Sequence, residues 1–154
     1  MPKHDPDRQG DELALDLEAY VAGLVNAVEK GMAAEVTPHG LSPLEFSLLR
    51  YCMDGERTAT QLAQVLPVDG SRVSRLVTGL VDKGMLRRRR LRSDRRGVML
   101  RLSDEGSELT SRIVENMRGY VATLTADIRA EDLSVFASVS SRIIANYDAM
   151  DESE

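Results

Sequence analysis

Hydroxyl and guanidinium side chains are concentrated between residues 71 and 78. The group consists of Ser71, Arg72, Ser74, Arg75 and Thr78. An arginine can donate two parallel hydrogen bonds to guanine, and a serine or threonine hydroxyl can bond a base edge or a phosphate. The chemistry that these residue types share is the recognition of a nucleic acid.

A second basic group follows along the chain and consists of arginines. Its members are Arg87–Arg90, Arg92, Arg95 and Arg96. A run of like charges is costly unless a polyanion meets it, so phosphate binding is favoured over the alternative of a solvated charged loop. Asp94 interrupts the run, and we predict that its carboxylate braces Arg96 through a charge-assisted hydrogen bond.

The net charge of the 154-residue chain is −5, which by itself argues against a polyanionic partner. The charge is unevenly distributed, however. Residues 54–102 contain twelve Lys and Arg against five Asp and Glu, a net charge of +7 that leaves −12 for the remainder. A basic middle segment between acidic ends is expected of a protein that binds DNA through one surface and repels polyanions over the rest.

The hydroxyl and arginine group lies on one face of a predicted helix. After a turn at Val68–Gly70, apolar residues recur at helical spacing, and Gly84 is expected to cap the end. The apolar stripe consists of Val73, Leu76, Val77 and Leu80. The polar group occupies the opposite face, so the helix presents it outward.

Two shorter helices are predicted before this one, each beginning with a capping box. Ser42 with Glu45 opens the first, which Asp54–Gly55 ends, and Thr58 with Gln61 opens the second, which Pro67 closes. After the polar helix, Met85–Leu91 and Val98–Leu102 have the pattern of two strands joined by an arginine-rich turn. This order is that of a winged helix-turn-helix, whose second helix enters the major groove.

We therefore predict a DNA-binding surface made by the polar helix and the wing. The wing arginines are expected at phosphates of the adjacent minor groove or inside it. The predicted contacts are Ser71, Arg72, Ser74, Arg75, Thr78, Arg92, Asp94, Arg95 and Arg96.

Long amphipathic helices are predicted at both ends of the chain. The first has an apolar stripe from Leu13 to Met32 and should end near Gly31; another begins at Ser103–Glu105 with a stripe from Ile113 to Ile128. A last helix carries Leu133 to Tyr147 before a frayed acidic tail, Asp148–Glu154. Their apolar side chains exceed what one small winged motif covers, which predicts a homodimer with half-sites about 10 base pairs apart.

The predicted fold is mostly α-helical with a small β-hairpin wing. We expect an N-terminal dimerisation helix in residues 1–37, a winged helix-turn-helix in residues 38–102, and C-terminal dimerisation helices with the tail in residues 103–154.

Residues for other chemistry are scarce. Cys52 is the one cysteine, and His4 and His39 are far apart, so we predict no disulfide, no metal site, no cofactor and no enzyme. Cys52 lies on the inward face of its helix, which favours an inert buried thiol over a redox switch. No export signal or membrane segment is recognised, and we expect a cytoplasmic protein.

Five segments of the chain resemble the MarR family of transcription regulators almost position by position. They are Thr60–Ala63, Val68–Leu80, Lys83–Leu86, Ser93–Arg96 and Leu100–Gly106. The most specific pieces are the Asp-Arg-Arg of the wing and the Leu-Ser-x-x-Gly that opens the next helix, where the family commonly has Thr in place of Ser103. The helical order is similar from about Leu13 to Tyr147.

The resemblance implies a homodimer whose first and last helices interlock and whose two winged motifs address a pseudo-palindromic operator. It also implies a pocket for a small aromatic or carboxylate effector between the dimerisation helices and the DNA-binding lobe. The candidate ligand contacts are Tyr20, His39, Phe46 and Tyr51. The alternatives are core positions for the aromatic residues and a solvent-facing loop for His39.

The predicted function is a sequence-specific regulator of transcription, a repressor that a small-molecule ligand releases from double-stranded DNA. Two alternatives remain at this point. Arg87–Arg90 are more basic than the family pattern requires, which favours an architectural DNA binder without sequence preference. The other alternative is an acidic helical dimer that acts as a protein-interaction module.

Overall fold

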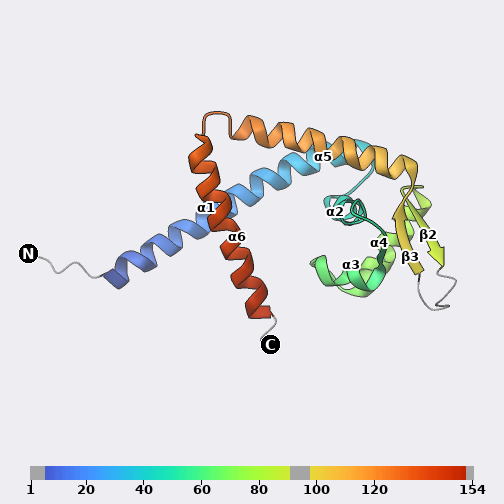
Figure 1. Ribbon diagram of the computed structural model, residues 1–154, viewed down its shortest axis with the longest axis horizontal. Coiled ribbons are helices and arrows are strands. Elements are labelled where there is room, and N and C mark those ends of the chain that lie inside the picture. Colours follow the sequence, from blue (N-terminus) through green and yellow to red (C-terminus); the bar gives the residue numbers. More distant parts are fainter. Residues whose placement is uncertain (1–5, 91–97, 152–154) are drawn as a thin grey trace, which may run out of the picture. The chain divides into compact units, whose positions relative to one another are not determined.

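A computed structural model describes residues 6–90 and 98–151 of the chain (Figure 1). The elements are α1 (Pro6–Val36), the 3₁₀ helix η1 (Thr37–His39), α2 (Pro43–Tyr51), β1 (Arg57–Thr58), α3 (Ala59–Val65), α4 (Gly70–Asp82), β2 (Leu86–Arg90), β3 (Val98–Leu102), α5 (Asp104–Leu124) and α6 (Ala130–Asp151). The predicted fold class is confirmed: helices dominate, and the one sheet described is small. The chain divides into two compact units, residues 1–119 and 120–154, which we describe separately.

Both predicted capping boxes are present. The Ser42 hydroxyl accepts a hydrogen bond from the backbone N–H of Glu45 at 3.2 Å, and the Glu45 carboxylate accepts one from the Ser42 N–H at 2.8 Å. Thr58 and Gln61 exchange the same pair of bonds at 3.2 and 2.9 Å. These bonds satisfy N–H groups that have no partner within their helices, and they set where α2 and α3 begin.

The sheet has the antiparallel order β1-β3-β2. The predicted hairpin is confirmed, and Leu86 and Leu100 turn its inner face toward the core. The strand β1 was not predicted, because two residues are too few to show an alternating pattern.

Three predicted helix ends are wrong. The first helix continues past Gly31 to Val36, which is fully buried, and the chain turns only at Gly40, where φ is +67°. A single glycine inside a helix costs only about 1 kcal/mol, which burial of Val36 offsets. The helix that begins at Asp104 ends at Leu124, so Ile128 lies in the connection to α6, and α6 itself continues through Asp148 to Asp151.

The core lies in the first unit, where helices α2, α3 and α4, the hairpin and the beginning of α5 meet. Its buried apolar residues are Val36, Leu41, Phe46, Leu48, Leu49, Cys52, Leu62, Leu66, Val73, Val77, Leu80, Leu86, Leu100, Leu109 and Ile113. We call residues 36–113 the winged lobe and residues 6–35 and 120–151 the helical arms.

A close backbone contact joins α5 to the wing. The Ser103 hydroxyl donates to the carbonyl of Gly84 at 2.6 Å and accepts from the N–H of Gly106 at 2.9 Å. A Cβ atom on Gly106 would lie 2.1 Å from the carbonyl oxygen of Met85, so this position has no room for a side chain. The Leu-Ser-x-x-Gly sequence therefore lets the start of α5 pack closely against Gly84 and Met85, which immediately precede β2.

Candidate nucleic-acid interface

Helix α4 has one buried face and one exposed polar face, as predicted. Val73, Val77 and Leu80 are buried in the core. Asp69 caps the helix, since its carboxylate accepts hydrogen bonds from the Ser71 hydroxyl at 2.6 Å and from the N–H of Arg72 at 2.9 Å. Both hydrogen bonds lower the pKa of the Asp69 carboxyl, the one from Ser71 more than the one from Arg72. They therefore keep this capping carboxylate ionised.

The exposed face of α4 presents two arginines whose guanidinium groups have no hydrogen-bond acceptor among the described residues. Arg72 and Arg75 are exposed, as are Ser71 and Ser74. Neither guanidinium donates a hydrogen bond to any residue that the structure describes, although Arg75 is near enough to Asp69 to lower the pKa of that carboxyl. The structure therefore brings the predicted helix residues together on one accessible face.

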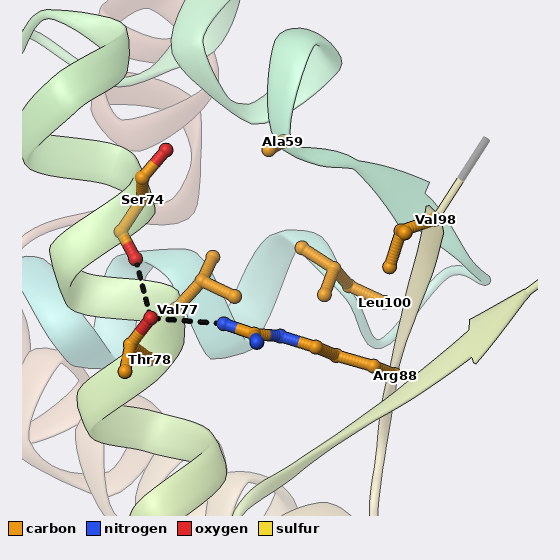
Figure 2. A pocket seen from close by; sticks show the side chains of 7 residues that line it. All are labelled: Ala59, Ser74, Val77, Thr78, Arg88, Val98 and Leu100. Atoms are coloured by element: carbon orange, nitrogen blue, oxygen red, sulfur yellow. Dashed lines mark hydrogen bonds between the residues drawn. The ribbon is translucent and has the colours of Figure 1, made fainter. Parts of the chain in front are cut away.

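Thr78 lies on the same face but is already engaged. Its hydroxyl donates to the carbonyl of Ser74 at 3.0 Å and accepts from Nη2 of Arg88 at 2.9 Å (Figure 2). Arg88 is not among the nine predicted contacts, although it belongs to the basic group for which phosphate binding is predicted. The available signal was the alternation along β2, which places Arg88 on the same side of the strand as the buried Leu86.

Two other wing arginines, Arg87 and Arg89, have acidic partners. Arg89 forms an ion pair with Glu56 at 2.5 Å, and its hydrogen bond lowers the pKa of the Glu56 carboxyl. Arg87 lies 3.6 Å from the carboxylate of Asp104. The predicted wing contacts Arg92, Asp94, Arg95 and Arg96 lie outside the described residues.

A lysine connects the end of α4 to the beginning of α2. Lys83 Nζ donates to the Glu45 carboxylate at 2.7 Å and to the carbonyl of Gly40 at 2.7 Å. Burial alone would raise the pKa of Glu45, but the hydrogen bonds from Lys83 and Ser42 bring it below its usual value. This contact positions the polar helix against the rest of the winged lobe.

The four candidate ligand residues lie in different places. Phe46 is 2% exposed and belongs to the core, while Tyr20 on α1 is 75% exposed. Tyr51 borders a hollow with Ser47, Arg50 and Asp54. His39 borders another hollow, of about 310 Å³, with Met85, Glu105, Glu108, Leu109 and Arg112. The described part of the chain therefore does not gather the four side chains around one hollow.

Cys52 is buried, and burial raises the pKa of its thiol to about 11, an effect that the charge of Arg57 opposes. Among residues 6–90 and 98–151, no three His, Cys, Asp or Glu side chains are grouped so as to hold a metal ion. No helix described in this chain is both long enough and apolar enough to cross a membrane.

The sequence pattern of the MarR family matches residues 39–97, which span η1 to the wing. This match covers 59 of the 154 residues, so the similarity to the MarR family holds for this part of the chain. Members of this family are transcription regulators and not enzymes.

Two curated Bacillus subtilis proteins are similar in sequence. The uncharacterized HTH-type transcriptional regulator YdgJ is 29% identical over 107 residues, which are 70% of this chain and 65%, just under two thirds, of that protein. The HTH-type transcriptional repressor MdtR is 20% identical over 137 residues, which are 88% of each chain.

Solved structures of MarR-type regulators have the same fold. A MarR family protein from Bacillus stearothermophilus superposes with a TM-score of 0.77 at 20% identity, over 94% of this chain and 99% of that one. The transcriptional regulator BldR from Sulfolobus solfataricus gives 0.69 at 26% identity, over 92% and 99%.

Proposed function

We propose that this chain is a sequence-specific, double-stranded DNA-binding transcription regulator that acts as a homodimer. The observation that carries the proposal is the exposed face of α4. Arg72 and Arg75 are held outward by a helix whose opposite face is buried, and no described residue accepts a hydrogen bond from their guanidinium groups, which can therefore donate to base edges. The adjacent basic hairpin supplies charge for the DNA backbone.

A homodimer is supported by the apolar surface of the helical arms. On α1 the exposed apolar side chains are Leu17, Tyr20, Val21, Leu24 and Val25. On α6 they are Val135, Phe136, Val139, Ile143, Ile144, Tyr147 and Met150. A second copy of the chain would cover such stripes and place two α4 helices for a pseudo-palindromic operator.

The proposed regulation is repression that a small aromatic or carboxylate ligand relieves. A structural neighbour, the organohalide-sensing regulator RdhR-CbdbA1625, was solved in its 2,4-dichlorophenol-bound form and superposes with a TM-score of 0.73 at 18% identity. The ligand would have to favour a dimer in which the two α4 helices no longer match successive major grooves. Its effect on DNA affinity cannot exceed its differential affinity for the two states.

The test is selection of bound duplexes from a randomised pool at near-physiological salt, followed by sequencing. A palindrome with half-sites about 10 base pairs apart is the expected result. Binding without a motif would contradict sequence specificity and support an architectural DNA binder. No binding by effector-free protein would contradict DNA recognition and support a protein-interaction module.

The substitution Arg75→Ala then tests whether the exposed face of α4 contacts DNA bases. If Arg75 contacts a base, the substitution should reduce operator affinity by about 1–3 kcal/mol and relax the preference at one position. Arg118→Ala on α5 removes an exposed arginine elsewhere and is the matched control. Equal binding by wild type and Arg75→Ala would contradict the assignment of α4 to the major groove.

A further inference from the structure

The arginines of β2 differ in the charge of their partners. Arg87 and Arg89 alternate with Arg88 along the strand, and each pairs with a carboxylate, Asp104 or Glu56. The partner of Arg88 within the described residues is the neutral hydroxyl of Thr78. The hydrogen bond therefore fixes the Arg88 guanidinium without cancelling its positive charge.

We propose that Arg88, positioned by Thr78, forms a binding site for a backbone phosphate of DNA at the junction of α4 and the wing. The proposal rests on the proposed DNA-binding function and adds a residue and a ligand group to it. Arg88 would contact the phosphodiester oxygens, and Thr78 would act as a positioning residue.

The surroundings of Arg88 fit a sugar-phosphate group. A hollow of about 240 Å³ lies between α4 and the hairpin, and Figure 2 shows the Arg88 side chain extending from β2 across it to Thr78. Its walls are Ala59, Ser74, Val77, Thr78, Val98 and Leu100 in addition to Arg88. The apolar walls suit the carbon atoms of deoxyribose, and the cationic side chain suits the phosphate.

The donors of Arg88 are sufficient for this role. A guanidinium carries five N–H donors in a planar fork that matches phosphate geometry. Thr78 accepts one of them, at 2.9 Å. The remaining donors can bind one or two phosphate oxygens while the hydrogen bond to Thr78 is kept.

The hydrogen bonds of Thr78 show why its role differs from that of Arg88. A threonine hydroxyl has one proton, and that of Thr78 is donated to the carbonyl of Ser74. It has no proton left for a phosphate oxygen, which is itself only an acceptor. As long as the bond to Ser74 is kept, Thr78 affects DNA binding through Arg88.

The decisive experiment compares Arg88→Gln with Arg87→Gln by measuring operator affinity over a range of salt concentrations. Each phosphate neutralised contributes about 0.9 to the slope of log K against log salt. For a dimer with two such sites, Arg88→Gln should reduce the slope by about 1.8 relative to wild type. Arg87→Gln removes the same charge from the same strand and should change the slope less, because the Asp104 carboxylate 3.6 Å away already offsets part of the Arg87 charge.

The sequence preference is the second measurement. A backbone contact carries no base information, so Arg88→Gln should weaken operator and random DNA by a similar factor, about tenfold at physiological salt. Loss of affinity for the operator alone would overturn the proposal and indicate a base contact. Equal slopes for Arg88→Gln and Arg87→Gln would also overturn it.

Variants of Thr78 test the positioning role and guard against a folding defect. Thr78→Val removes the acceptor but keeps the shape, and should reduce affinity with little change in slope; Thr78→Ser should restore wild-type affinity. Arg88→Lys should keep the slope and lose affinity, since it keeps the charge without the planar fork. If Thr78→Val binds as wild type does, the positioning role is wrong. If the wild-type protein selects no DNA at all, the proposed DNA-binding function itself is wrong, which is a different outcome from a failure of the Arg88 site alone.

Discussion

The winged lobe and the helical arms differ in how far their apolar side chains are buried within a single chain. The chain has two phenylalanines, one in each region. Phe46 in the lobe is 2% exposed, whereas Phe136 on α6 is 55% exposed in a single chain. The lobe therefore completes its core from its own sequence, while the arms present apolar stripes that only another surface can cover.

The largest expected difference between the two regions concerns these phenylalanines. Phe46→Ala leaves a cavity in a closed core and should reduce the free energy of unfolding by about 3–5 kcal/mol. Phe136→Ala should leave the lobe intact and weaken dimerisation. Urea denaturation at several protein concentrations separates the effects, since only a dimerisation defect depends on concentration. If both variants lose the same free energy of unfolding at every protein concentration, the distinction between the lobe and the arms is wrong.

A charge on the apolar stripe of α6 tests whether the stripe is a subunit interface. Ile143 is 49% exposed in the single chain, and Ile143→Glu would bury an unpaired carboxylate in each half of a dimer. Dimer affinity should fall at least about a hundredfold, roughly 3 kcal/mol, which sedimentation at micromolar concentration measures. Ser141→Glu, on the opposite side of α6, is the control and should remain dimeric. A monomeric wild type would contradict the dimer directly.

Two glycines of α5, Gly106 at its start and Gly119 in its second half, differ in the space around them. Gly106→Ala places a Cβ against the Met85 carbonyl and should cost about 1–3 kcal/mol of stability. Gly119→Ala meets no atom within 4 Å and should stabilise the helix by up to about 1 kcal/mol. Thermal unfolding of the two variants measures both effects. A tolerated alanine at position 106 would show that the start of α5 can move away from β2.

The smallest expected effect is at Cys52. Burial raises the pKa of its thiol from 9.0 to about 11, so little thiolate is present at pH 7 to 8. A thiol reagent should modify the native protein slowly and the unfolded protein rapidly. Because the folded state keeps the proton to higher pH, this thiol stabilises the fold below about pH 9, and the contribution is lost as pH rises toward 11. Rapid modification of native protein at pH 7 would show that the core opens around α2.

Much of the winged lobe was predictable because its signals are local. The Ser42–Glu45 and Thr58–Gln61 boxes form hydrogen bonds within one helical turn, and the stripe of α4 follows from helical spacing alone. The end of α1 was placed wrongly at Gly31, because what continues the helix to Val36 is burial against residues distant in sequence. The strand β1 was missed because two residues are too few to show an alternating pattern, and what defines the strand is its long-range pairing with β3.

The sequence by itself determined the exposed arginines of α4, since a helix with one apolar face must turn its other face outward. Only the tertiary structure decided the partners of the arginines on β2. Alternation along a strand indicates which side a residue faces, but not that Arg88 meets Thr78 while Arg89 meets Glu56. Those pairings depend on the packing of α4 against the hairpin, and therefore on contacts between segments that are separate in the chain.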